Sequence, residues 1–125
     1  MVSDVNGKVL LVKDNRRGWE FPGGFTGLGE PLTDSAIREV KEESGVDILL
    51  TKLLGIEQDI EQSHMVFIYK GSPIGGKLSS SKETKAAGYF TVDEALQMMQ
   101  LVHSKERLLR CMNEKEIPFS IEIGK

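Results

Sequence analysis

The chain has 125 residues, of which 39% are hydrophobic and 28% charged, and its formal net charge is −3. This is the size and composition of a single globular domain, and the negative charge argues against a general affinity for nucleic acid. Cys111 is the only cysteine, so an intrachain disulfide is excluded. With neither a recognisable secretory signal nor an apolar run long enough to span a bilayer, we expect a cytoplasmic protein with no membrane partner.

The N-terminal quarter predicts a hairpin, two strands and a loop. Asn6-Gly7 is a two-residue hairpin signal, and the apolar run 9–12 behind it predicts a buried strand. Only five residues precede the turn, so we expect a truncated first strand, because the chain starts late or upstream residues are absent. The alternating segment 19–21 predicts a second short strand, and the glycine-rich segment 22–29 predicts an irregular loop.

The centre of the chain predicts one long helix followed by two strands. A helix is expected to begin near Thr33 and to run to Ser44, with Gly45 as its C-terminal stop. Strands are expected at 53–57 and 65–69, followed by a long loop over 71–85.

The C-terminal third predicts one strand and two helices. Residues 89–91 form the expected strand, and Thr91 and Glu94 have the spacing of a capping box that opens a helix to about Met99. A last helix is expected over 104–114. Strands mixed with helices, without a strict βαβ repeat, predict one α/β domain over residues 1–125, with a mixed sheet and helices on both faces.

Three glutamates of the central helix share one face. At about 100° per residue, Glu42 and Glu43 lie roughly 60° and 40° to either side of Glu39, and Arg38 is four residues before Glu42, within pairing reach. Clustered carboxylates repel one another unless they are neutralised, and a hard divalent cation with oxygen ligands, such as Mg²⁺, does this well. The alternative is a solvated acidic helix face.

The segment 24–46 resembles the Nudix box. Gly24 is followed by five residues, Glu30, seven residues and then the run REVKEESGV at 38–46, so nine specified positions match without a gap. The lead-in WEFPG at 19–23 is also similar to that of the Nudix, or MutT-like, hydrolase family.

The resemblance implies an α/β/α sandwich in which the box forms loop, helix and loop. It implies one or more Mg²⁺ or Mn²⁺ ions held by oxygen ligands, namely the carboxylates of Glu39, Glu42 and Glu43 and the carbonyl of Gly23. It also implies an ion pair between Glu30 and Arg38 that holds the loop against the helix. A metal-bridged diphosphate is a better electrophile, and a carboxylate then accepts a proton from water, a role for which Glu39 is a candidate.

Glu83 is a second candidate, as a base or further metal ligand, because it lies in a loop just ahead of an aromatic strand. The alternative is an exposed loop carboxylate between Lys82 and Lys85. His64 and His103 have no partners at metal-ligand spacing and are expected to be surface or structural residues.

Four residues before the box are candidates for substrate binding. Arg16 and Arg17 suit phosphate recognition, although a solvated turn explains them equally well. Trp19 and Phe21 are candidates for stacking on a base, and core packing is the alternative.

The predicted function is Mg²⁺-dependent hydrolysis of a pyrophosphate bond in a nucleoside triphosphate or another nucleoside diphosphate derivative. Residues 61–64 lack the downstream markers of the ADP-ribose and diadenosine polyphosphate subgroups, and the dinucleotide-cofactor marker is also absent, which favours a small triphosphate. An ADP-ribose or sugar-nucleotide pyrophosphatase and a non-catalytic nucleotide-binding module remain as alternatives. The expected partner is a small nucleotide rather than a nucleic acid, and the sequence does not decide between a monomer and a homodimer.

Overall fold

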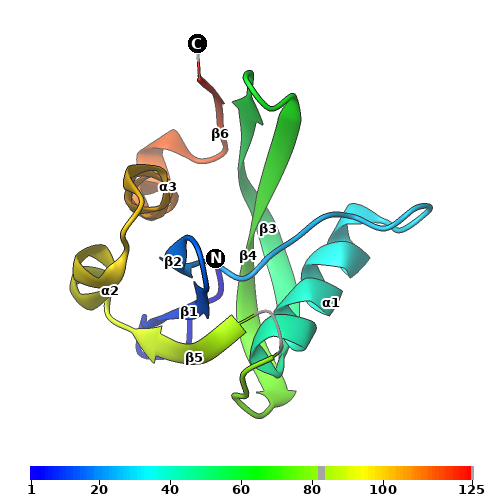
Figure 1. The fold of residues 1–125 in the computed structure, drawn as a ribbon, viewed down its shortest axis with the longest axis vertical. Coiled ribbons are helices and arrows are strands. Elements are labelled where there is room, and N and C mark those ends of the chain that lie inside the picture. The colour runs from blue at the N-terminus through cyan, green and yellow to red at the C-terminus, as the bar shows by residue number, and fades with distance from the viewer. Residues whose placement is uncertain (82–83, 125) are drawn as a thin grey trace.

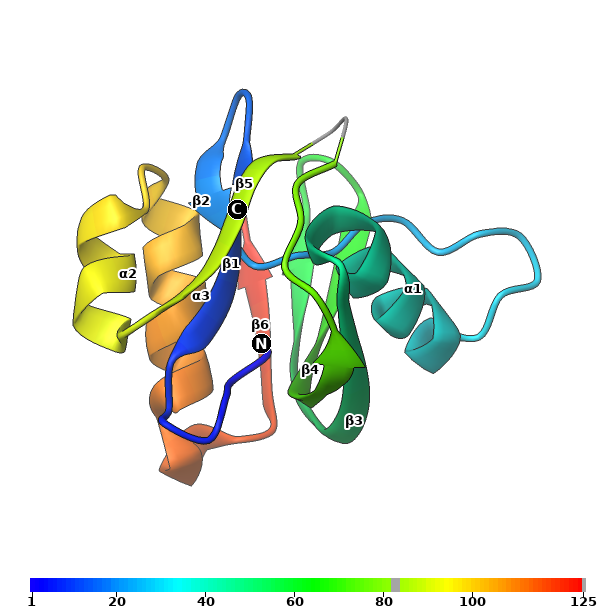
Figure 2. The same cartoon turned by 90° about the horizontal axis from the view of Figure 1, so that it is seen from below.

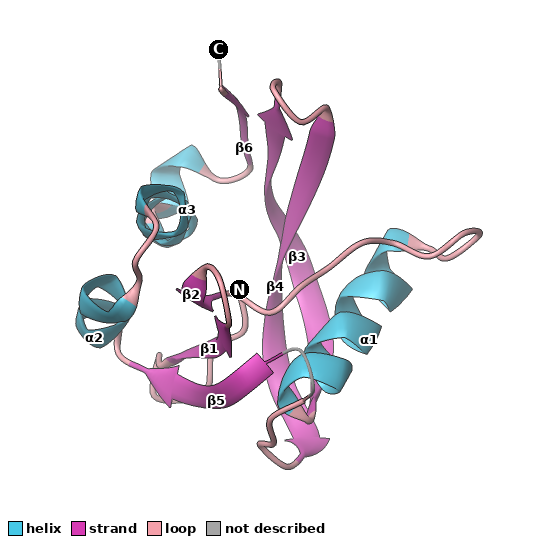
Figure 3. Ribbon diagram, in the orientation of Figure 1, coloured by secondary structure: helices cyan, strands magenta, loops and turns pink. Residues whose placement is uncertain are grey.

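The computed structural model describes residues 1–81 and 84–124, which form two three-stranded sheets with helices on both sides (Figures 1 and 3). The elements follow the order β1 (Val9–Asp14), β2 (Gly18–Glu20), α1 (Leu32–Ser44), β3 (Val46–Asp59), β4 (His64–Gly76), β5 (Thr84–Phe90), α2 (Val92–Met98), α3 (Val102–Met112), a 3₁₀ turn (Glu114–Glu116) and β6 (Phe119–Ile123). One sheet has the order β2-β1-β5 and the other β4-β3-β6. The second sheet is mixed, because β3 pairs antiparallel with β4 and parallel with β6.

Strand β1 is buried on both faces, as its unbroken apolar run predicts. Because side chains alternate along a strand, Leu10 faces one core and its neighbours the other. Leu10 packs with a set beneath α1 that includes Val40, Val46 and Ile48. Val9 and Leu11 pack against the layer of α2 and α3. Figure 2 shows α1 on one side of the strands and α2 with α3 on the other, so the predicted helix–sheet–helix arrangement is confirmed.

The N-terminal residues connect the two sheets. Val2 bridges Gly71 of β4 in parallel fashion and Ser3 bridges Val9 of β1 in antiparallel fashion, so the predicted partner strand is present but short. The turn type predicted at Asn6-Gly7 is wrong. The Asp4 amide donates to the Lys8 carbonyl at 2.9 Å and Gly7 alone in this turn has a positive φ, of 77°, whereas a two-residue hairpin turn needs a positive φ at its first central residue.

Strands β3 and β4 form a long twisted hairpin that extends well beyond the predicted segments. Residues 46–52, which no predicted element covered, and residues 71–76, predicted as loop, are both strand. The first segment breaks the alternation at Leu49-Leu50, and the second carries Pro73 and three glycines, so a period of two did not reveal them. β4 lies at the edge of its sheet, a position where proline is tolerated.

Strand β6 was not predicted. It pairs in parallel with residues 55–59 of β3, beginning with Gly55 opposite Phe119. A Cβ on Gly55 would lie 2.4 Å from the Phe119 ring, so only glycine permits this close packing. The contact joins segments more than 60 residues apart, which no local pattern reveals.

The three helices lie close to their predicted positions. α1 begins one residue before Thr33, after an extended Pro31, and ends at Gly45 as expected, with φ of 79° at that glycine. The Thr91–Glu94 capping box is present at α2, while α3 begins and ends two residues earlier than predicted. Among the described residues, no helix combines the length and apolar character needed to cross a bilayer.

Candidate active site

The loop before α1 projects from the body of the molecule (Figure 2) and is tied to the helix by Arg38. The Arg38 Nε and Nη2 atoms donate to the two Glu30 carboxylate oxygens at 2.8 and 3.0 Å. Nη2 also donates to the Phe25 carbonyl at 3.3 Å, and the Gly27 amide donates to Glu30 at 2.9 Å. The bidentate pair that the resemblance implies is therefore present in the structure.

Arg38 also contacts two of the helix glutamates. Its Nη1 atom lies 3.1 Å from Glu39 and 3.0 Å from Glu42. Hydrogen bonds from Arg38, and secondly from the Gly27 amide, lower the pKa of Glu30 to about 2. One guanidinium thus serves three carboxylates, which leaves this cluster with a net negative charge.

Glu39 and Glu43 converge on the glycine pair that ends the lead-in. The Gly23 amide donates to Glu43 Oε1 at 2.7 Å, and Glu43 is 9% exposed. A Cβ on Gly24 would lie 2.5–2.7 Å from the carboxylate atoms of Glu39, so this carboxylate rests against bare backbone. Helix α1 therefore presents two carboxylates at Gly23-Gly24, while Glu42, with 57% of its side chain exposed, faces outward beside Arg38.

The donor set at this point fits a hard divalent cation. Glu39, Glu42, Glu43 and the Gly23 carbonyl offer only oxygen atoms, the donors that Mg²⁺ and Mn²⁺ take in proteins, and Gly24 is a cradle that a larger residue would fill with a side chain. Within residues 1–81 and 84–124, no three His, Cys, Asp or Glu side chains are already gathered as a metal-binding group. For all three carboxylates to bind one cation, Glu42 would have to leave Arg38. Otherwise a further ligand would have to come from elsewhere.

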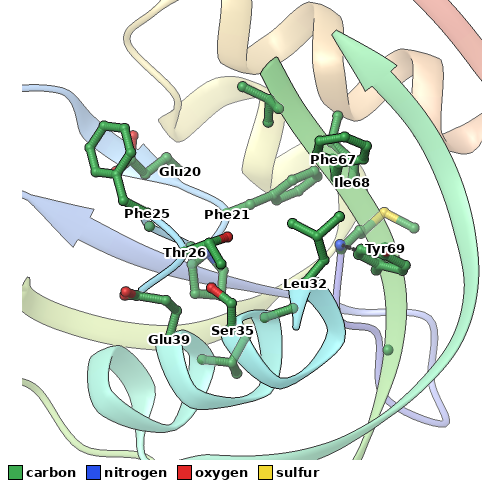
Figure 4. Close-up of a pocket in the computed structure, with 18 of the residues that line it drawn as sticks. Glu20, Phe21, Phe25, Thr26, Leu32, Ser35, Glu39, Phe67, Ile68 and Tyr69 are labelled. Atoms are coloured by element: carbon green, nitrogen blue, oxygen red, sulfur yellow. Dashed lines mark hydrogen bonds between the residues drawn. The ribbon is translucent and has the colours of Figure 1, made fainter. Parts of the chain in front are cut away.

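A cavity of about 580 Å³ opens beside these carboxylates, within the size range of small-ligand sites. Figure 4 shows Glu39 and Ser35 rising from α1 toward the loop that carries Thr26. Phe67, Ile68 and Tyr69 of β4 line another wall, with Phe21 and Leu32 between the two. The cavity thus joins a polar, acidic edge to largely apolar walls.

The structure separates the four predicted substrate-binding residues. Phe21 and Arg17 line the cavity, but Arg17 is held by Glu20 through two hydrogen bonds of 2.8 Å, which raise the Arg17 pKa. Trp19 does not line the cavity, because its ring packs edge-to-face on Phe90 with centroids 5.1 Å apart. Arg16 is exposed in the turn after β1 and does not line it either. For these two residues the structure favours core packing and a solvated turn over substrate contact.

Glu83, predicted as a base or metal ligand, lies outside the described residues and remains a prediction.

Two cavity features were missed by sequence reasoning. His64, expected to be a surface or structural residue, is exposed as expected, but it also lines the cavity and meets the Phe25 ring edge-to-face with centroids 5.4 Å apart. Arg107 of α3 also lines it and is bound to Glu57 of β3. The contacts join residues 39 and 50 positions apart, so no motif signals them.

Comparison with known proteins agrees with the fold and the box. A "MutT-like protein" from Streptomyces ambofaciens is 29% identical over 100 residues, which cover 79% of this chain and 65% of the relative. An "ADP-ribose pyrophosphatase" from Methanocaldococcus jannaschii is 25% identical over 117 residues, covering 87% of this chain and 68% of the relative. The crystal structure of a NUDIX hydrolase from Nitrosomonas europaea has the same fold, with a TM-score of 0.83 at 20% identity, covering 99% of this chain and 77% of that one. The NUDIX domain model matches residues 1–110, and the chain therefore belongs to the Nudix family.

Proposed function

We propose that this protein hydrolyses a pyrophosphate bond in a small nucleotide, with Mg²⁺ or Mn²⁺ bound by Glu39, Glu42, Glu43 and the Gly23 carbonyl. The observation that carries the proposal is the convergence of Glu39 and Glu43 on Gly23-Gly24 at the edge of the cavity. When bound, the ion supplies Lewis-acid chemistry by stabilising negative charge on the diphosphate oxygens. Without it, a cluster with excess carboxylates would repel an anionic substrate.

The protein's own groups have separate tasks in this proposal. Glu39 is the proposed acceptor of a proton from the attacking water, a role supported by its position at the cavity with 13% of its side chain exposed. Arg38 and Glu30 act as positioning residues, since they fix the loop on α1. The apolar walls exclude water around the reacting group and strengthen the electrostatic interactions there. Glu83 stays the competing candidate for the base.

A nucleoside triphosphate is the proposed substrate class, with release of the monophosphate and pyrophosphate. ADP-ribose is the second candidate, because a relative that covers most of this chain is named an ADP-ribose pyrophosphatase. The moderate volume of the cavity, about 580 Å³, favours the more compact substrate. Product analysis on a panel of triphosphates, ADP-ribose and dinucleotides separates the two. A tenfold higher kcat/KM for ADP-ribose than for every triphosphate would contradict the triphosphate proposal and leave the metal site intact.

The test of the chemistry is Glu43→Gln. Glutamine still accepts the Gly23 hydrogen bond, so the fold and thermal midpoint should be kept, but the ligand charge is lost. We expect kcat to fall by about 10³-fold, because losing a metal ligand forfeits several kcal/mol of transition-state stabilisation. Glu61→Gln, in the exposed turn after β3, is the matched control and should retain the wild-type rate. A Glu43→Gln rate near wild type with Mg²⁺ present would refute the metal assignment.

A further inference from the structure

A buried ion cluster lies at the α3 side of the cavity, away from the Nudix box. Glu57 of β3 is 1% exposed. Arg107 Nε donates to both of its oxygens, at 3.1 and 3.0 Å, and Nη2 donates to Oε1 at 2.7 Å. A second arginine, Arg110, brings its Nη2 atom to 3.6 Å from Oε2. The Arg107 guanidinium is therefore held by contacts with both carboxylate oxygens.

Stability alone does not explain this arrangement. Burying an ion pair costs desolvation that the mutual attraction often fails to offset, and well-packed apolar residues commonly serve as well or better. Here two guanidiniums share one carboxylate, which leaves a net positive charge of one in the cluster. Arg110 lies over the Phe119 ring, 5.6 Å from its centroid, with 21% of its side chain exposed, and does not line the cavity. Arg107 instead borders the cavity, with 26% of its side chain exposed.

Arg107 retains unused donors. Its Nε and Nη2 atoms are engaged by Glu57, and within the described part of the chain Nη1 has no protein acceptor. A guanidinium carries donors only and is charged at any working pH. A ligand group beside Nη1 must therefore offer an acceptor. A ligand N–H or O–H group placed there would lose its hydrogen bond with water and would find no acceptor on Nη1 to replace it.

The surroundings indicate which part of a nucleotide lies there. The metal and phosphates belong with Glu39 at the α1 edge. Arg107 of α3 is bound instead to Glu57, whose register partner on β4 is Val66, and Val66 packs in one apolar cluster with Phe21 and Ile68. Apolar walls suit the faces of a base. Figure 4 shows Phe21 and Ile68 gathered on the side of the cavity away from Glu39.

We propose that Arg107 is a specificity-determining residue that selects purines carrying a 6-oxo group over those carrying a 6-amino group. The proposal rests on the nucleotide hydrolysis proposed above. The guanidinium donates to the 6-oxo oxygen, whereas a 6-amino group sets donor against donor. A site built to hydrogen-bond one group discriminates strongly against an analogue that leaves it unpaired.

Inosine and adenosine triphosphates provide the matched test, because the bases differ in the 6-substituent and the N1 proton that accompanies it. With Mg²⁺, we expect wild-type kcat/KM to favour inosine triphosphate by about 10- to 100-fold, the range for one hydrogen bond to a charged group. Arg107→Met should bring the ratio to within about threefold of unity through a higher KM for the 6-oxo substrate. Arg110→Met removes the neighbouring cation that does not line the cavity, and should keep the preference. If Arg107→Met does not fold, Arg107→Lys, which lacks the planar fork, should lower the ratio by at least about threefold.

Binding of inosine and adenosine monophosphates in EDTA, measured by calorimetry, separates this inference from the proposed chemistry. Preferential binding of the 6-oxo nucleotide that disappears in Arg107→Met supports the inference even if no triphosphate is hydrolysed, in which case the proposed function alone fails. Equal wild-type kcat/KM for the two triphosphates overturns the inference and leaves the proposed function standing. An Arg107→Met variant that weakens both nucleotides equally also overturns it, since the arginine would then serve any nucleotide.

Discussion

Two arginine–glutamate clusters border the same cavity and have opposite charge balance. At α1, one guanidinium pairs with three carboxylates in a partly exposed setting. At α3, two guanidiniums serve one carboxylate that is almost fully buried. The first arrangement retains negative charge that attracts a cation, and the second retains positive charge that attracts an acceptor. The comparison shows that the count and burial of the partners, rather than the presence of an ion pair, determine what a cluster can bind.

The largest expected effect is on stability, when the buried cluster is broken. Glu57→Gln removes the negative charge that pairs with both Arg107 and Arg110, and the loss in the free energy of unfolding should be about 2–4 kcal/mol, below the full value for a buried pair because both arginines reach solvent in part. Urea unfolding measures it. Glu42→Gln breaks the exposed Arg38–Glu42 pair at α1 and should lower the free energy of unfolding by less than about 1 kcal/mol. Equal losses in the two variants would remove the distinction between the clusters.

A second variant tests whether the glycine backbone positions the acidic cluster. A Cβ at Gly24 would overlap the Glu39 carboxylate, so Gly24→Ala must displace that side chain. We expect kcat to fall about tenfold or more, equivalent to about 1.4 kcal/mol of transition-state stabilisation, with little change in the thermal midpoint. Gly27→Ala is the matched control, since its Cβ would meet only side-chain atoms of Glu30, at 3.4–3.9 Å, which is ordinary van der Waals contact. If both variants keep the wild-type rate, the close approach at Gly24 has no catalytic role.

The smallest effect concerns acid sensitivity of the exposed cluster. The Glu30 pKa is lowered from 4.5 to about 2 by Arg38, and secondly by the Gly27 amide. Because the folded pKa lies below the unfolded one, this carboxylate stabilises the fold above pH 4.5, and its contribution is lost as the pH falls toward 2. A carboxyl-detected NMR titration should give a Glu30 midpoint near 2 in the wild type and a clearly higher one in Arg38→Gln, still below 4.5 because the Gly27 amide hydrogen bond remains. A wild-type midpoint of 4.5 would show that the Arg38–Glu30 ion pair is absent in solution.

The parts of the molecule that sequence patterns anticipated are those encoded locally. The 13 residues of α1 have helical periodicity and are followed by a glycine stop, Gly45. The box at 24–46, which spans the helix, singled out Glu39 and Glu43, the glutamates that lie at Gly23-Gly24. Long-range features were not accessible in this way. β6 pairs with a strand about 60 residues earlier, and Glu57 is 50 residues from Arg107, so neither leaves a periodic or motif signal. Trp19 illustrates a third limit, since an aromatic residue before the box suits stacking and core packing equally until its neighbour Phe90 is known.

Strand β1 has a consequence for the cooperativity of the molecule. Leu10 belongs to the core beneath α1, while Leu11 belongs to the core beneath α2 and α3. Neither layer can melt separately without leaving one face of a fully buried strand in water, and such partial openings are therefore costly. The cavity draws Glu39 from one layer and Arg107 from the other. Its two chemically opposite ends are thus carried by a single unfolding unit, which keeps their spacing constant for as long as the protein is folded.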